Sequence, residues 1–211
     1  MTPKQLAFQD AVKGIIKNLE KRNMEGYFYE DSASCVKAIT NLMENGSVIS
    51  WGGSESIKEC GLMDAVAKGN YTLIDRLTAK SPEESRQLFA KAVLSDYYLM
   101  SSNAVTFDGE LINIDGNGNR VACLIQGPKN IIMVVGMNKL VSDVEAGYAR
   151  VRNIATPANV KRLNKITPCF QAGRCCDCLS PECICNQVVI TRRSAHPGRI
   201  KIFFVAEELG Y

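Results

Sequence analysis

The chain has 211 residues, 46% of them hydrophobic and 22% charged, which is the composition of an ordinary globular protein. Its net charge of +3 is too small to indicate a nucleic-acid-binding protein, and no apolar segment is long enough to cross a bilayer. The N-terminus lacks the charged and apolar regions of a secretory signal, so we expect a cytoplasmic protein with reduced thiols.

The N-terminal part, residues 1–45, is predicted to be mainly helical. Thr2 to Gln5 combine an N-cap, a proline at the first helical position and a capping-box glutamine, which predicts a helix from there to about Leu19. Asp31 is expected to cap a second helix that ends near residue 45. A short strand is predicted between these helices, at residues 27–29.

Strands and helices continue to alternate in the middle of the chain. The predicted strands are 47–51, 71–74, 97–100, 111–114 and 130–135. Capping boxes at Ser81 and Ser142 predict helices to about Val93 and Asn153. This alternation predicts an α/β fold, as one domain over residues 1–211, with a mostly parallel sheet between helix layers.

The C-terminal part is different. Residues 166–186 are rich in cysteine and turn residues, which predicts a loop. Two alternating segments, 188–192 and 199–205, then predict a short β-hairpin or edge strands. The sole histidine, His196, lies in the turn between them and is expected to be exposed to solvent. A Ser-His-Asp triad is therefore excluded, and any general acid or base must be a carboxylate or a lysine.

Three loops that follow predicted strands carry residues suited to a small anionic ligand. In an open parallel α/β sheet, ligands bind beyond the carboxyl ends of the strands. Glycine lets the backbone approach a ligand, and hydroxyl and amide groups suit phosphate or carboxylate. The alternative interpretation is that the loops are ordinary strand-to-helix turns. The candidate ligand-binding residues are Gly52, Gly53, Ser54, Ser101, Ser102, Asn103, Asp115, Gly116, Gly118, Asn119 and Arg120.

Charged residues near these loops are further candidates. Arg76, Arg120 and Lys139 are possible partners for an anion, and the carboxylates of Asp96, Asp108, Glu110 and Asp115 bracket the two central loops. The third loop is not a dinucleotide-binding fingerprint, because Val121 stands where the last glycine is required, and no Walker A motif is present.

Six of the nine cysteines lie in one window of 17 residues. Cys175 and Cys178 form a Cys-x2-Cys pair, which Cys169 and Cys185 flank. Four such thiolates can converge on Zn²⁺ or an iron–sulfur cluster, although the spacing is neither that of a zinc ribbon nor that of a bacterial ferredoxin. Redox-active thiols and disulfides are the alternatives.

The remaining two cysteines of the window, Cys176 and Cys183, are surplus to four ligands. They could be disulfide partners, free thiols or alternative ligands. The catalytic residues are not identified by the sequence.

Motifs in consistent order over about residues 40–211 resemble the LUD (lactate utilisation) domain family. They are the segments Trp51–Ser54, Glu59, Gly61–Leu62, Ile74–Arg76, Ser101–Ala104, Asp108–Leu111, Asn113–Arg120, Pro128–Lys129, Val134–Lys139, Thr167–Cys169, Gly173–Pro181, Ile184–Asn186 and Leu209–Tyr211. The resemblance is to short single-domain members with a cysteine-rich tail, and Cys169, Cys175, Cys178 and Cys185 are the cysteines that match the family pattern.

The resemblance implies the fold of ribose-5-phosphate isomerase, glucosamine-6-phosphate deaminase and the CoA-transferases. It also implies an accessory or redox-partner role in the oxidation of L-lactate to pyruvate, beside an iron–sulfur oxidoreductase. Glu110 does not match the nucleophile motif of a CoA-transferase, so that activity is not inferred.

Two other functions remain open. One is an enzyme that acts on a sugar phosphate or CoA-linked substrate, and the other is a non-catalytic subunit of a homo-oligomer with a structural cysteine site. In every case we expect a small anionic ligand or a protein partner, and neither a nucleic acid nor a membrane.

Overall fold

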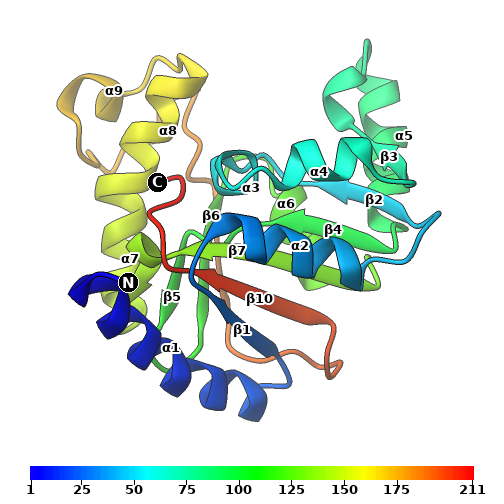
Figure 1. Ribbon diagram of the computed structural model, residues 1–211. Helices are drawn as coiled ribbons and strands as arrows, with labels where there is room; N and C mark the ends of the chain where they lie inside the picture. The colour runs from blue at the N-terminus through cyan, green and yellow to red at the C-terminus, as the bar shows by residue number, and fades with distance from the viewer.

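The computed structural model describes residues 1–211 and contains two β-sheets (Figure 1). The larger sheet has the strand order β1-β10-β7-β4-β2-β3, and all neighbouring strands are parallel. Its strands are β1 (Glu25–Tyr29), β2 (Val48–Trp51), β3 (Thr72–Ile74), β4 (Tyr97–Met100), β7 (Asn130–Gly136) and β10 (Ile200–Val205). The predicted α/β fold with a mostly parallel sheet is confirmed.

The smaller sheet, in the order β8-β5-β6-β9, was not predicted. Its strands are β5 (Ala104–Thr106), β6 (Leu111–Asp115), β8 (Leu140–Val141) and β9 (Gln187–Thr191). The β5 strand is antiparallel to β6 and parallel to β8, and β6 is antiparallel to β9. In this sheet the end of β6 lies beside the carboxyl edge of the larger sheet.

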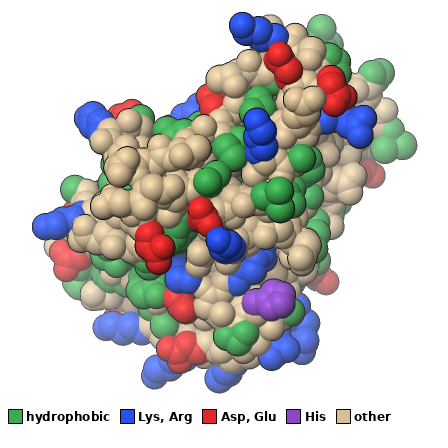
Figure 2. Space-filling view, turned by 90° about the vertical axis from the view of Figure 1, so that its right-hand side faces the viewer, with side chains coloured by type: hydrophobic (Ala, Val, Ile, Leu, Met, Phe, Trp, Pro, Cys, Tyr) green, Lys and Arg blue, Asp and Glu red, His purple; other side chains and the backbone are tan.

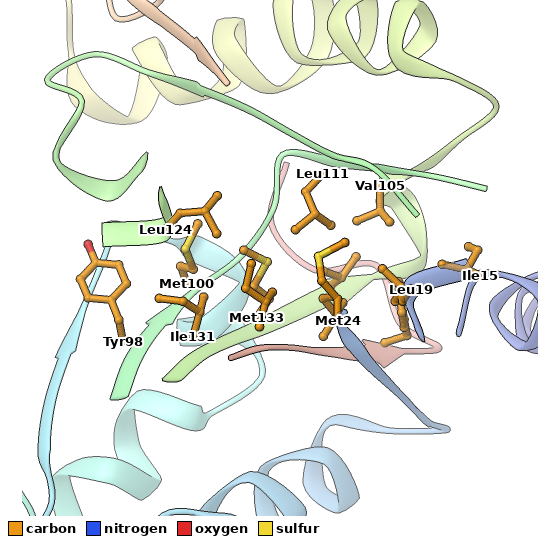
Figure 3. Packing of buried hydrophobic residues seen from close by; sticks show 14 of the residues in the cluster. Ile15, Leu19, Met24, Tyr98, Met100, Val105, Leu111, Leu124, Ile131 and Met133 are labelled. Atoms are coloured by element: carbon orange, nitrogen blue, oxygen red, sulfur yellow. The ribbon is translucent and has the colours of Figure 1, made fainter. Parts of the chain in front are cut away.

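The side chains of the larger sheet alternate between two apolar layers, because successive residues of a strand point to opposite faces. One face packs on α2 (Ser32–Leu42), α3 (Glu55–Glu59) and α4 (Leu62–Lys68). The other face packs on α1 (Pro3–Lys21), α5 (Pro82–Val93), α6 (Asn119–Ile125) and the smaller sheet. Figure 3 shows Leu124 of α6 beside Met100, and Leu111 and Val105 of the smaller sheet on the face of the larger sheet from which Met133 projects.

The helix starts largely follow the predicted caps. Thr2 and Gln5 form a complete capping box, and Asp31 accepts a hydrogen bond from the Ser34 N–H. At α5 only half of the predicted box forms. Ser81 caps the Glu84 N–H, but the Glu84 carboxylate accepts from the Lys80 N–H instead of from Ser81.

The helix predicted after Ser142 needs two corrections. Its N-cap is Asp143, which accepts from the Ala146 N–H, while the Ser142 hydroxyl donates to the Asp143 carboxylate. The helix also does not stop near Asn153. From α7 (Val144–Arg150) it passes through a π-helical segment, η3 (Val151–Ala155), into α8 (Thr156–Leu163). Pro157, which has no N–H to donate, comes shortly after the residues in which the backbone hydrogen bonds change from the α-helical to the π-helical pattern.

The predicted C-terminal hairpin is wrong, since the two segments belong to different sheets, and the alternative of edge strands holds for β9 but not for β10. The β9 strand pairs with β6, whereas β10 lies inside the larger sheet, parallel to β1 and β7. The reason is visible in the run Phe203–Val205, which is buried on both faces. A continuous apolar run is typical of a central parallel strand.

The short elements that remain are η1 (Arg76–Thr78), η2 (Met137–Lys139) and α9 (Pro168–Ala172). The last one is a helical turn inside the stretch predicted as a loop. None of the helices combines the length and apolarity required to span a bilayer.

We expect Gly136→Ala to lower the free energy of unfolding by about 1–3 kcal/mol, because an added Cβ would lie 2.6 Å from the Leu209 nitrogen and 2.8 Å from the Glu207 oxygen. Gly14→Ala, on the exposed side of α1, meets no atom within 4 Å and should stabilise by about 0.4–1 kcal/mol. Urea unfolding measures both, and equal midpoints for Gly136→Ala and the unaltered chain would contradict the packing described.

Candidate functional site

A cavity of about 690 Å³, here called the strand-end cavity, lies at the carboxyl ends of β2, β4 and β7. All three predicted ligand loops contribute to its wall. The first two follow β2 and β4, parallel strands that end at the same edge of the larger sheet, and the third follows β6 of the smaller sheet. The predicted residues that line it are Gly53, Ser54, Ser101, Asn103, Asp115, Gly116, Asn119 and Arg120.

Three other candidate residues shape the loops without lining the cavity. At Gly52 an added Cβ would lie 2.9 Å from the Arg120 side chain, so only glycine fits there. Ser102 is fully buried, and its hydroxyl donates to the Ala104 carbonyl over 2.8 Å. Gly118 has φ of +78° in the turn that leads into α6, a conformation that favours glycine.

The Arg120 side chain is buried and bonded to other parts of the chain, so it is not free to bind an anion. Its guanidinium forms an ion pair with Asp115, with 3.3 Å between Nε and Oδ2. The other N–H groups contact oxygens of the loop after β4 and of β6, namely the side chains of Asn103 and Asn113 and the carbonyls of Ser101 and Ile114. Burial lowers the pKa of Arg120, and Asp115 opposes that shift. Its N–H groups are therefore committed within the protein.

Only three buried side-chain polar atoms of the chain lack a hydrogen-bond partner, and they lie at this site. They are Ser54 Oγ, Arg76 Nε and Tyr98 Oη. Ser54 and Arg76 line the cavity, and the Tyr98 hydroxyl lies beside Gly52. An unpaired buried polar group is costly, about 1–3 kcal/mol, so unsatisfied groups on a cavity wall indicate a polar ligand.

The other cationic residues of the wall are paired. Arg162 lies 3.4 Å from Glu55, and Lys165 lies 3.5 Å from Glu182. Together with the Arg120–Asp115 pair, this leaves Arg76 and Lys139 as the wall cations without a carboxylate partner.

Lys139 is buried, with 4% of its surface exposed, at the end of η2. Its Nζ donates to Ser56 Oγ over 2.7 Å and to Ser101 Oγ over 3.1 Å. Burial, together with the nearby charges of Arg150 and Arg120, lowers the pKa of Lys139 to about 7, and only the Glu59 carboxylate opposes this shift. Ser56 was missed by sequence reasoning, and its only signal is its place two residues after the Gly-Gly-Ser loop.

Of the four candidate carboxylates, only Asp115 lines the cavity. Asp96 binds Lys129 over 2.7 Å, and Glu110 lies 3.5 Å from Arg22. His196 is exposed, as predicted, and lies in a separate groove at Pro128 and Arg199. Figure 2 shows the histidine, in purple, among Lys and Arg side chains on that surface.

A second cavity, here called the cysteine cavity, has a volume of about 120 Å³ and lies beside α8. All six cysteines of the C-terminal window line it: Cys169, Cys175, Cys176, Cys178, Cys183 and Cys185. The chain has no disulfide, and no group of three or more Cys, His, Asp or Glu side chains is placed to hold a metal ion in this arrangement.

Polar groups surround the sulfur atoms of the cysteine cavity. Arg152 Nε donates to Cys175 Sγ over 3.0 Å, and its guanidinium also pairs with Asp177. Burial raises the pKa of Cys185 to about 11, and the Thr156 hydroxyl, 3.5 Å from the sulfur, opposes the shift.

The two cavities share walls formed by Ile114, Thr156, Cys183 and Ile184. Asn186 donates to the Gly116 carbonyl over 3.0 Å, which fastens the cysteine loop to the third ligand loop. The π-helical segment η3 contributes to both walls, through Val151 to the strand-end cavity and through Arg152 to the cysteine cavity. Such segments often occur at functional sites.

A family model and one solved structure agree with this architecture. The profile of the LUD domain family matches residues 12–205. The chain is similar to the crystal structure of a DUF162 family protein from Deinococcus radiodurans, with 14% identity, 94% of this chain and 98% of that chain covered, and a TM-score of 0.51. The delta subunit of eIF2B from Chaetomium thermophilum gives 10% identity, 54% and 49% coverage and a TM-score of 0.36. No curated protein matches the chain.

The lowered pKa of Lys139 predicts a pH-dependent stability. Between about pH 7 and the ordinary lysine value of 10.5, the unfolded chain binds this proton and the folded chain does not. The free energy of unfolding should therefore rise with pH across that window, relative to Lys139→Gln. Urea unfolding of both proteins from pH 6 to 9 measures the difference, and a difference that stays constant with pH would contradict the assignment.

Proposed function

The chain belongs to the LUD domain family, and we propose that it binds a small anionic ligand in the strand-end cavity. The observation that carries this proposal is the pair of unsatisfied donors on one wall, Ser54 Oγ and Arg76 Nε. A carboxylate or phosphate would satisfy both, since charge-assisted hydrogen bonds to anions are among the strong ones. Lys139, whose Nζ has no carboxylate partner, adds a second polar position in the same cavity.

We further propose that Cys169, Cys175, Cys178 and Cys185 hold an iron–sulfur cluster or Zn²⁺. The donor set fits such a group, because all four thiols face one small cavity and thiolates suit these metals. In the present arrangement the sulfurs contact hydroxyl and N–H groups, so binding would replace those contacts. A cluster would supply one-electron transfer, whereas Zn²⁺ would fix the loop.

In this proposal the chain is an accessory or redox-partner component of L-lactate utilisation, working beside an iron–sulfur oxidoreductase. The support is the family membership together with the cysteine cavity adjoining an anion cavity. The second candidate, an enzyme acting on a sugar phosphate or CoA-linked substrate, is favoured by the buried lysine in the same cavity. A purely structural role for the cysteine loop is the third.

The anion site is tested with Arg76→Gln. Phosphate, pyruvate, lactate, sugar phosphates and CoA esters are screened by thermal shift, and the affinity for each binder is measured by calorimetry. The loss of one charged hydrogen bond should weaken binding about tenfold or more, while the fold is retained. Arg86→Gln, on the exposed surface of α5, is the matched control and should bind normally. If none of these compounds binds to the unaltered chain, the proposal fails.

The cysteine proposal is tested by anaerobic reconstitution with iron and sulfide, and separately with Zn²⁺, followed by metal analysis. We expect Cys178→Ser to abolish or strongly reduce metal content, whereas Cys176→Ser, at a surplus thiol, should retain it. Equal losses in both variants would contradict the ligand assignment. Metal loss that lowers the melting temperature but leaves anion binding intact would favour the structural role.

A further inference from the structure

Lys139 is the only buried lysine of the chain, and anion binding alone does not account for its surroundings. We infer that Lys139 is a nucleophilic amine that forms a Schiff base with a small carbonyl compound carrying a carboxylate or phosphate group. This inference rests on the anion site proposed above and names the chemistry of its ligand.

The hydrogen bonds of Lys139 suit a neutral amine. Its Nζ has two protein partners, the hydroxyl oxygens of Ser56 and Ser101, and both accept from it. A neutral amine has two N–H groups, so these contacts use both and leave the lone pair without a protein partner. An ammonium group would have a third N–H to place, for which the protein offers no acceptor.

The charges around Lys139 also favour the neutral form. Its Nζ forms no ion pair with a carboxylate, and the charges of Arg150 and Arg120 both act against a positive charge on it. The Glu59 carboxylate, which opposes them, accepts a hydrogen bond from the Gly210 N–H. Desolvation together with neighbouring cations is the way in which enzymes activate lysine amines.

A serine hydrolase that uses Lys139 as its base fits the geometry less well. In such a site the serine hydroxyl must donate its proton to the amine. Here Ser56 donates to the Leu209 carbonyl over 3.1 Å, and Ser101 donates to the Ser102 carbonyl over 3.2 Å. Both hydroxyl protons are therefore committed to the backbone, and the serines orient the amine instead of being activated by it.

Other residues of the cavity wall can bind the carboxylate or phosphate group of the same ligand. Ser54 and Arg76, with their unsatisfied donors, line the same 690 Å³ space as Lys139 and can hold the anionic end of a ligand. The amine then attacks the carbonyl carbon, a C–N bond forms, and the carbonyl oxygen leaves as water with the two amine protons. The product is an imine, no electrons are exchanged with another molecule, and hydrolysis reverses the step.

The test is reductive trapping with sodium cyanoborohydride near pH 7.5, using pyruvate in one arm and dihydroxyacetone phosphate in the other. Peptide mapping of the unaltered chain locates the adduct, so the main result does not depend on whether a variant folds. We expect the adduct on Lys139 to exceed that on Lys165 by about tenfold or more, because an ordinary lysine is almost fully protonated at this pH. Lys165 is the matched control, since it lines the same cavity but pairs with Glu182.

The two arms distinguish the source of the anionic group, and an adduct selective for Lys139 in either arm supports the inference. Lys139→Gln, checked for folding by circular dichroism, should lose that adduct. If pyruvate or the phosphate ester raises the melting temperature but Lys139 is not trapped, the inference is overturned and the anion site stands. If adducts are spread equally over the lysines, the inference is overturned and the anion site is unaffected. If neither compound binds and no adduct forms, the inference is overturned and the result also counts against the anion site.

Discussion

The geometry of the strand-end cavity depends on one buried guanidinium, that of Arg120. A buried charge is tolerated only when it is paired and its N–H groups are satisfied. Arg120 meets that requirement with Asp115, two asparagine side chains and two backbone carbonyls. These partners come from the loop after β4 and from β6 with the turn that follows it. The guanidinium therefore fixes the smaller sheet against the edge of the larger one, and the cavity forms between them.

This arrangement separates cations that build the cavity from cations available to a ligand. Arg120, Arg162 and Lys165 each have a carboxylate partner, so their charges are largely cancelled. Arg76 and Lys139 have none. A ligand of the cavity thus meets two different polar positions, one guanidinium with an unused N–H and one amine held by two hydroxyl groups. Such an asymmetric pair favours a molecule with two different functional groups.

Sequence reasoning predicted the parts of the fold that depend on local signals. Strand–helix alternation and the side-chain caps placed most strands and helix starts, and parallel topology then explains why the loops after β2 and β4 meet. The third loop joins them through the smaller sheet, which the sequence did not predict. The failures have non-local causes. The position of β10 depends on burial by two neighbouring strands, and the role of Ser56 depends on Lys139, which is far away in the chain. The role of Arg120 depends on how β6 folds back beside the loop after β4. No pattern of residue types distinguishes an arginine that binds a ligand from one that binds its own loops.

The cysteine loop extends this argument, because it is also a wall of the strand-end cavity. Cys183 and Ile184 belong to both cavities, and Asn186 ties the loop to Gly116. The shape of one cavity is therefore not independent of the other. If a group bound the thiols and rearranged them, it would move residues that face the strand-end cavity. By linkage, a ligand that favours one arrangement of that wall would favour the matching arrangement of the thiols. The proposed metal site and the proposed anion site are therefore expected to be coupled through the wall that both cavities share.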